Sequence, residues 1–445
     1  MVIKSIFTGK QLRKKILFTL VVLAVSQFLV RVPAYGIDTS YFKSVFGNGG
    51  IFGFASMLTG GSLENLSLGT FGITSYITAS IMLQLFCIVV PRLETIRRDG
   101  EYGRKWYQKA EYALTAVLTI GGSIALAISA AKMGLYTDNN VRSYVLSIAG
   151  WIIGGLIIVT LGKMVEDHGI GNGISLILAC NILSSIPEDL SIYYFETMEG
   201  VSLGMAARNG VVILAAVFVF VFIAVWLQYG EIRVPVRQSK KQVDDVGYCP
   251  YIPIPASMAN VYPVIYASTI LSLPGILSTI FSYTGAGRGQ AWQNILSICN
   301  SSNWYNPEHA WQSCGLLVYI GLLVVMGFYS SMMVFTPAEI ADNMKKNGDT
   351  IEGVSPGKDT EIYFNRRRRV MSSVNVVVLA VLVILPDLAC AKAGIAQFSF
   401  VGTSMVIVVS TLKDTVIRLK GSILAEGKMD NLFGKGDYHG IIKRN

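Results

Sequence analysis

The chain has 445 residues, of which 52% are hydrophobic and only 15% are charged, and its formal net charge is +9. Soluble globular domains carry about 25% charged residues, so the composition excludes a soluble protein and predicts an all-α polytopic membrane protein. The six cysteines form no C-x-x-C pair and the three histidines share no ligand spacing, which argues against a zinc or thiol redox site. We therefore expect no metal, no cofactor and no catalytic residue.

Hydropathy along the chain predicts ten transmembrane helices. The basic start followed by an apolar run is similar to a signal peptide, but no small-residue cleavage site follows it, so we interpret it as the first span. The spans are expected at 16–33, 71–90, 111–131, 144–162, 170–187, 209–228, 260–283, 314–335, 370–388 and 396–416.

Lysine and arginine lie mostly on one side of this predicted topology. With the N-terminus inside, 30 of the 37 basic residues fall in inside segments and 7 in outside segments. This asymmetry is a strong positive-inside signal, and it predicts that both termini are cytosolic. Two long basic loops, 229–259 and 336–369, then face the cytosol. The outside loop 284–313 is rich in Gly, Ser and Asn, and we expect it to be irregular.

The interiors of the spans contain no Asp, Glu, Lys or Arg, for example over 113–131, 211–228 and 315–335. Ion-coupled transporters and proton relays need charges within the membrane. The absence of such charges argues against a secondary transporter, although that class also has about ten spans. It is typical of a pathway that must not conduct ions.

A short apolar segment, 51–66, precedes the second span and breaks at Gly60-Gly61. It is too short to cross a bilayer, which takes about 20 apolar residues. Backbone of this kind survives at membrane depth only inside protein or beside a watery cavity. The sequence therefore predicts a re-entrant segment next to a cavity, although a buried strut remains the alternative.

The glycine-rich string from Asp167 to Ser175 reads DHGIGNGIS. Glycine-rich loops can bind phosphates, but this one has G-x-G-x-G spacing, follows no strand and precedes a membrane helix. A tight turn between adjacent spans is the simpler interpretation. The chain also contains no Walker A string, so we do not expect it to hydrolyse ATP.

Several ordered strings, taken together, resemble the SecY family, the channel subunits of bacterial protein translocation. The resemblance covers nearly the whole chain, from the basic N-terminus to about Asp414, and the glycine-rich string is its strongest match. The other matching strings are GGSL at 60–63, GITSYITASIMLQL at 72–85, the run from Pro91 to Arg104 ending in GEYGR, MANVYPVIYAS at 258–268, NMKKNG at 343–348, PGKDT at 356–360 and GTS at 402–404.

This resemblance implies two pseudo-symmetric five-helix halves, 1–190 and 191–420, followed by a cytosolic tail, 421–445. It also implies the central subunit of a channel that translocates unfolded secretory proteins across the bacterial plasma membrane. Membrane proteins would leave sideways, between the second and third helices on one side and the seventh and eighth on the other.

In the family, a ring of apolar side chains narrows the pore and a plug closes it from outside. Spacing alone would favour ordinary helix packing for these residues, so the assignment rests on the resemblance. Matching motif to motif, the ring falls on Ile77, Ile81, Ile174, Leu178, Ile270 and Ile407. The plug, at about 51–66, would include Ile51, Phe52, Phe54, Met57, Leu58, Gly60, Gly61 and Leu63.

The basic cytosolic loops resemble the family's docking surface for the ribosome and for the SecA motor ATPase. Ribosomal RNA and acidic protein surfaces would both attract such loops, although charge that only sets topology is the alternative. The docking candidates are Arg104, Arg233, Arg237, Lys240, Lys241, Lys345 and Lys346. The resemblance also implies SecE as an obligatory partner and SecG as a further one.

Two positions depart from the family pattern. Ser355 stands before Pro356-Gly357, where the family has an arginine tied to SecA function, and Lys163 stands where the family has a glutamate. These departures admit a specialised accessory channel as an alternative to the main one. A membrane scaffold or insertase without a pore is a further alternative. The sequence also leaves open whether Cys299 and Cys314 form a disulfide.

Overall fold

The structure is a computed structural model of the whole chain. It describes residues 10–38, 59–97, 99–132, 134–137, 140–198, 218–226, 228–238, 251–255, 257, 262–281, 289–299, 304, 310–393 and 401–425.

A helix occurs at each of the ten predicted spans, so the predicted helical membrane fold is confirmed. At the sixth span, residues 218–226 are helical. The other nine helices are α2 (Lys10–Arg31), α5 (Gly72–Val89), α7 (Gly100–Lys132), α8 (Val141–His168), α9 (Gly173–Met198), α11 (Tyr262–Phe281), α13 (Cys314–Val334), α15 (Lys358–Ala393) and α16 (Val401–Ala425).

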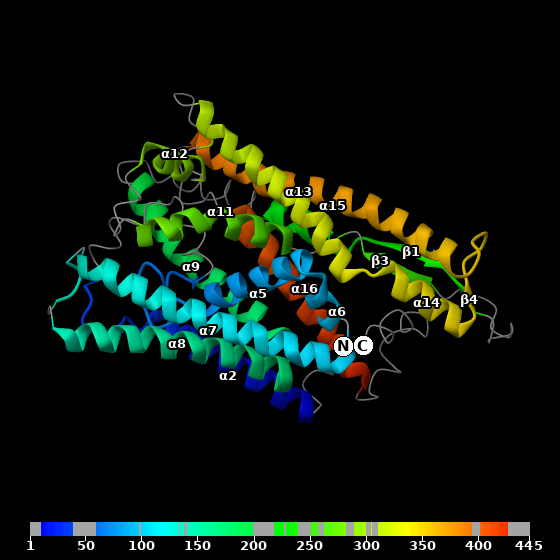
Figure 1. Cartoon of the computed structure of the whole chain (residues 1–445), viewed down its shortest axis with the longest axis horizontal. Coiled ribbons are helices and arrows are strands. Elements are labelled where there is room, and N and C mark those ends of the chain that lie inside the picture. Colours follow the sequence, from blue (N-terminus) through cyan, green and yellow to red (C-terminus); the bar gives the residue numbers. More distant parts are fainter. Residues whose placement is uncertain are drawn as a thin grey trace.

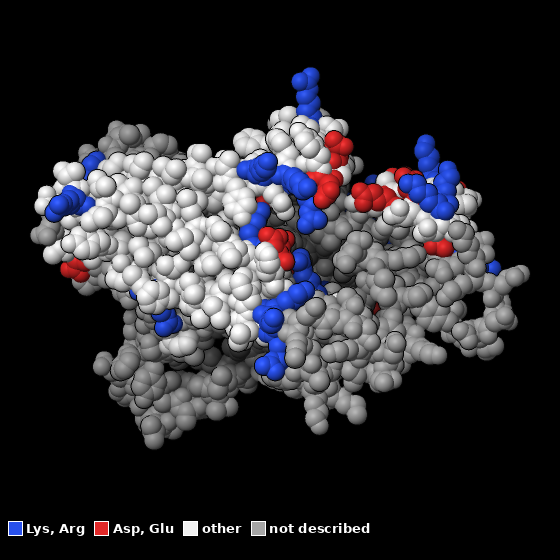
Figure 2. All heavy atoms as spheres, turned by 90° about the horizontal axis from the view of Figure 1, so that it is seen from below, with Lys and Arg blue, Asp and Glu red and all other residues white. Residues whose placement is uncertain are grey.

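Within the described residues, four helical segments are long and apolar enough to cross a membrane: 100–132, 141–168, 311–347 and 358–386. Two shorter apolar helices, Gly72–Cys87 and Gly173–Ser185, accompany them. On α7 and α8 the outward side chains are apolar, as at Val117 and Ile153, which are 64% and 58% exposed. Figure 2 shows this face as a broad surface without charged groups, bounded by charged groups at both ends. Such a belt is what a bilayer covers.

The helices form two groups that meet at the centre of the molecule (Figure 1). In one group α7 packs on α5 and α8, and α2 packs on α8 and α9. In the other, α13 packs on α11 and α15, and α15 packs on α16. The groups meet where α16 contacts α9 and where α11 contacts α7.

Shorter elements lie at the two ends of the bundle. At one end, which we call the loop end, are α6 (Pro91–Arg97), α14 (Pro337–Asn347) and four strands: β1 (Glu231–Pro235), β2 (Arg237–Gln238), β3 (Tyr251–Pro255) and β4 (Asp349–Thr350). At the opposite end, the far end, α12 (Gln290–Cys299) and the 3₁₀ turn η3 (Ala310–Ser313) precede α13. The prediction of an irregular loop over 284–313 is therefore wrong for these two segments.

The two long loops predicted to be cytosolic fold together at the loop end. β1 pairs with β3 within the first loop, and β2 pairs with β4 of the second loop, with Arg237 opposite Thr350. Val234 and Ile254 from the first loop share a buried cluster with Met344, Ile351 and Phe364 from the second loop and the start of α15. Although the loops are far apart in sequence, they form one small hydrophobic core.

Candidate pore and docking surface

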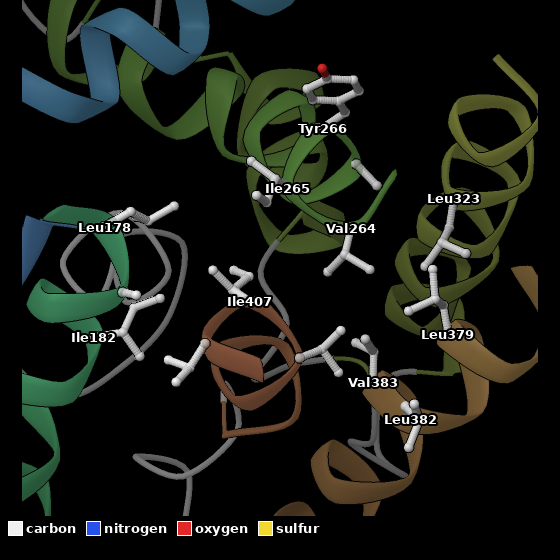
Figure 3. Packing of buried hydrophobic residues seen from close by; sticks show 14 of the residues in the cluster. Leu178, Ile182, Val264, Ile265, Tyr266, Leu323, Leu379, Leu382, Val383 and Ile407 are labelled. Atoms are coloured by element: carbon white, nitrogen blue, oxygen red, sulfur yellow. The ribbon is translucent and has the colours of Figure 1, made fainter. Parts of the chain in front are cut away.

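One large hydrophobic cluster lies at the centre of the molecule. The helices α5, α9, α11 and α16 all contribute to it, together with α2, α8, α13 and α15. Ile81 of α5, Leu178 of α9 and Ile407 of α16 are buried in it, at 4%, 4% and 1% exposure, and Ile77 and Ile270 pack against it half-buried. Figure 3 shows Ile407 pointing between Leu178 of α9 and Ile265 of α11. The structure thus brings together five of the six residues predicted to form the pore ring.

Ile174, the sixth predicted ring residue, lies elsewhere. Its side chain packs against α8 so closely that a Cβ added at Gly162 would lie 2.6 Å from its Cγ1. The buried residue that the cluster contains instead is Ile182, one turn beyond Leu178 on α9. Leu178 and Ile182 have the same i,i+4 spacing as the predicted pair Ile174 and Leu178, so both pairs fit the sequence and only packing distinguishes them.

The described part of the predicted plug, residues 59–66, and the residues that follow it up to Phe71 form a tight series of turns. Gly60 and Gly61 both have left-handed backbone, with φ of +66° and +76°, which only glycine adopts without strain. The Ser62 hydroxyl bonds to the hydroxyls of Ser67 and Thr70, and the Thr70 hydroxyl donates to the Ser67 carbonyl oxygen. The segment is therefore a preformed turn rather than a continuation of α5. Of the predicted plug residues, Ile51, Phe52, Phe54, Met57 and Leu58 lie outside the described residues.

The predicted plug hinge contacts the helix that carries the ring residue Leu178. A Cβ added at Gly60 would lie 3.0 Å from the Cβ of Asn181 on α9. The side-chain oxygen of Asn181 accepts a hydrogen bond from Gln27 Nε2 at 2.8 Å, which ties α2 to the same place. Because Asn181 follows Leu178 by three residues, the hinge lies within about one helical turn of the hydrophobic cluster.

Hydrogen bonds around Gln84 join α5 to α11 and α13. The Tyr266 hydroxyl of α11 donates to Gln84 Oε1 at 2.8 Å, and the Tyr329 hydroxyl of α13 donates to the Gln84 backbone oxygen at 3.1 Å. Gln84 Nε2 donates to Ser80 Oγ at 3.3 Å on its own helix, which orients the amide. We call this set the Gln84 seam. The sequence motif included Gln84 without indicating its partners, which come from helices distant in the chain.

A polar cavity of about 310 Å³ lies between α5, α6, α7 and α8. Lys163 is one of the two departures from the family pattern, and its amine lies 4.1 Å from the centre of the Tyr112 ring. Glu111 also lines the cavity and is buried, at 5% exposure. Charged groups of both signs therefore surround the cavity. Its lining residues are Tyr76, Arg97, Arg104, Tyr107, Gln108, Glu111, Lys163, Glu166 and Asn172.

Two of the predicted docking residues, Arg233 and Arg237, are held by the fold of the loop end. Arg233 forms an ion pair with Glu231 at 2.9 Å and stacks over the Tyr251 ring at 4.9 Å. Arg237 pairs with Glu352 at 2.8 Å, which links the first loop to the second. Arg104 is exposed at the polar cavity.

Lys345 and Lys346 are exposed in the last turn of α14. The helix stops there because Gly348 adopts left-handed backbone, at φ +74°, and its N–H bonds back to the carbonyls of Met344 and Lys345. The NMKKNG string thus presents two lysines beside a helix C-terminus, where positive charge is favoured. Lys240 and Lys241 lie outside the described residues.

The two cysteines of the far end are both free thiols, so Cys299 and Cys314 do not form a disulfide in this structure. Partial burial raises the pKa of the Cys299 thiol.

Both the sequence and the fold resemble those of known proteins. The sequence matches the SecY family model over residues 67–416. It is similar to the protein translocase subunits SecY of Streptomyces galbus and Escherichia coli K12, at 29% identity in both cases. These alignments cover 94% and 97% of this chain and 96% of each relative.

Solved structures with the same fold include one described as a protein-conducting channel, with a TM-score of 0.67, 18% identity and 94% of both chains covered. A second structure has a TM-score of 0.66, 16% identity and the same coverage. Its description says that the plug domain of the SecY protein stabilises the closed state of the translocation channel. A third, Sec61 from a canine ribosome–channel complex, has a TM-score of 0.63, 17% identity and again 94% coverage of both chains.

Proposed function

The chain belongs to the SecY family, and we propose that its central hydrophobic cluster is the seal of a protein-conducting channel. The chain is a subunit of a protein translocase, as its relatives are. The observation that carries the proposal is the meeting of α5, α9, α11 and α16 in one apolar cluster. Those are the four helices from which the ring was predicted.

An apolar ring suits this task for a physical reason. A narrow apolar passage excludes ions because water does not stably fill it. Apolar side chains make no directional bonds with one another, so they can move apart around a passing polypeptide and close again behind it. We propose Ile77, Ile81, Leu178, Ile270 and Ile407 as this ring. Ile182 is proposed in addition, because it is buried beside Leu178.

We further propose that residues 51–66 form a plug that moves on the Gly60-Gly61 turn. The turn lies against Asn181, next to the ring, so a displacement of the segment would uncover the ring from the far end. A plug that only braced the bundle would need no such proximity to the apolar cluster.

The Gln84 seam supports a sideways exit for apolar helices. It lies between α5 on one side and α11 and α13 on the other, which are the helices expected to border the exit. We propose that the halves 1–190 and 191–420 separate along it. Hydrogen bonds between side chains can be exchanged for others as the helices part, at a net cost of about 1 kcal/mol each.

The loop end is proposed as the docking surface for a ribosome or a motor protein. Its exposed Arg233, Arg237, Lys345 and Lys346 stand on a small folded unit. Relatives in the canine and yeast complexes are described as ribosome-bound. We propose SecE, SecG and SecA as the other partners, with both termini in the cytosol of a bacterium and the chain in its plasma membrane. The energy for transport would come from these partners.

Cross-linking tests the pore directly. In a chain whose six native cysteines are replaced, single cysteines at Ile81 and Ile270 should cross-link to a stalled secretory chain. Val117→Cys, on the lipid-facing side of α7 and 64% exposed, is the control and should not cross-link. If both ring positions fail to react while the stalled chain remains bound, the pore assignment is wrong.

Ion leak separates a channel from a scaffold and from a transporter. Deleting residues 51–66 should make vesicles that contain the channel leak small ions, because the plug no longer supports the seal. A scaffold or insertase without a pore would show no leak. Substrate-dependent solute uptake in the absence of protein transport would indicate a secondary transporter.

The departure at Ser355 is tested by SecA-driven translocation of a secretory precursor into liposomes that hold this chain with SecE and SecG. Protease-protected precursor that requires ATP would show that the motor tolerates Ser355. Protection restored only by Ser355→Arg would indicate an accessory channel with a different cytosolic partner.

A further inference from the structure

The helix α12 at the far end has sharply separated polar and apolar sides. At 100° per residue, its six apolar residues cover one continuous arc centred near Ile295, and its four polar residues, Gln290, Gln293, Asn294 and Ser297, cover the opposite arc. The ten residues contain no charged side chain. Such a pattern predicts a helix with one face against an apolar surface.

The chain itself covers only part of that apolar face: Trp292, Leu296, Ile298 and Cys299 are half-buried. None of the ten residues of α12 is buried, and Ile295, at the middle of the apolar arc, is 43% exposed. At the C-terminal end of the helix, Cys299 packs against the central hydrophobic cluster. An amphipathic helix whose central apolar residue faces outward needs something else to cover it.

The position of α12 relative to α13 is fixed by contacts with the first turns of α13. The carbonyl oxygen of Ile298 accepts a hydrogen bond from the indole of the buried Trp304 at 2.8 Å, and Trp304 lies against Tyr319 of α13 with ring centroids 5.5 Å apart. A Cβ at Gly315 would lie 1.9 Å from the Ile298 oxygen, so only glycine permits this approach. Figure 1 shows α12 beside the start of α13.

The outward surface of α13 becomes apolar at the same level. Trp311 in η3 is 43% exposed, and Leu317 and Val318 in the first turns of α13 are 69% and 49% exposed. The segment 311–347 is one of those long and apolar enough to span a membrane. The surface that α13 presents to lipid therefore begins next to α12, and exposed tryptophan is typical of that boundary.

We propose that α12 lies in the bilayer interface at the far end, with Ile295 directed into the lipid and its polar arc toward water. Helices of this kind bind by the apolar area they bury. Because α12 has no charge, its contact should not depend on anionic lipid. Its attachment to α11 and α13 holds it at the surface, so little binding energy is required. The inference rests on the chain spanning a membrane and does not depend on protein transport.

The test uses the full chain, with native cysteines replaced, in phosphatidylcholine vesicles. An environment-sensitive fluorophore is attached to Ile295→Cys or, as the matched control on the polar arc, to Asn294→Cys. We expect blue-shifted emission at 295 and quenching by lipids with a nitroxide near the head group that is roughly twofold stronger than at 294, because an interfacial helix inserts only one face. Aqueous iodide should quench 294 more strongly.

Two results would overturn the inference. Equal iodide quenching at both positions would mean that α12 stands in water. Protection of 295 from both iodide and nitroxide lipid would mean that a protein surface, such as a second copy or a partner subunit, covers the helix. Unchanged thermal unfolding of both labelled chains would verify that neither substitution disturbs the fold, and adding anionic lipid should not change the pattern.

Discussion

The contact between α9 and α16 differs from the contact of α5 with α11 and α13, although both join the first half of the chain to the second. The first is made of buried aliphatic side chains, such as Leu178 and Ile407. The second also has apolar contacts, through residues such as Ile81, but it adds hydrogen bonds around Gln84. Apolar packing resists separation through buried area, whereas hydrogen bonds are directional and can be exchanged for others. The difference supports the proposal that the two halves separate on the α5 side.

The largest effect should come from the apolar contact. Ile407→Ala removes most of a side chain that is 1% exposed, and a cavity of this kind costs about 2–5 kcal/mol. Unfolding in detergent, followed by tryptophan fluorescence, measures the loss. Leu412→Ala on the same helix, at 52% exposure, is the control. Equal losses for the two variants would mean that α9 and α16 do not form the tight contact described.

The next effect should come from the Gln84 seam. Gln84→Leu leaves the Tyr266 hydroxyl, which lies within the buried cluster, without its acceptor. An unsatisfied buried group of this kind costs about 1–3 kcal/mol. In the double variant with Tyr266→Phe, the two losses should not add, because both substitutions remove the same bond. Additive losses of unfolding free energy would mean that Gln84 and Tyr266 do not interact, which would contradict the hydrogen bond between them.

A smaller effect is expected at Tyr329. Tyr329→Phe removes one hydrogen bond to the backbone oxygen of Gln84 and keeps the ring, so the expected loss is about 0.5–1.5 kcal/mol. Tyr102→Phe, at 71% exposure, should change nothing measurable in the same unfolding assay. If Tyr329→Phe matches this control, α13 contributes no hydrogen bond to the seam.

The smallest effect on stability should be at the loop end. Arg237→Gln breaks an ion pair whose side chains are 75% and 73% exposed, and such pairs contribute about 0–1 kcal/mol. Binding of a ribosome or motor should nevertheless weaken, and more at low salt than at high salt, because exposed charges are screened. Glu352→Gln breaks the same pair but keeps the positive charge, so its binding should not fall.

Hydropathy was enough to predict the ten helices, because each span needs a long apolar run that few other structures require. It could not predict β2 and β4, since their pairing depends on two loops from distant parts of the chain. The helix α12 was not predicted because its ten uncharged residues lie between a Gly-rich segment and a Ser- and Asn-rich one, a composition that resembles a loop. Its apolar arc was nevertheless present in the sequence.

For the candidate site, the sequence predicted the helices that carry the ring residues and the turn at Gly60-Gly61. The i,i+4 spacing fits Ile174 with Leu178 as well as Leu178 with Ile182, and only the close approach of Ile174 to Gly162 distinguishes them. The hydrogen-bond partners of Gln84 could not be predicted from the sequence, because they are two tyrosines on helices that are distant in the chain. Sequence periodicity gives the face of a helix, whereas hydrogen-bond partners follow from tertiary packing.

The pairing of β2 with β4 also has a consequence for biogenesis. Two membrane helices, α11 and α13, lie between these strands in the chain. The strands can meet only when both helices have been inserted, since a single failed insertion would leave the two loops on opposite sides of the membrane. The Arg237–Glu352 pair and the shared core around Phe364 would then not form. A chain in which only one of the two helices inserts would therefore lack the folded loop end.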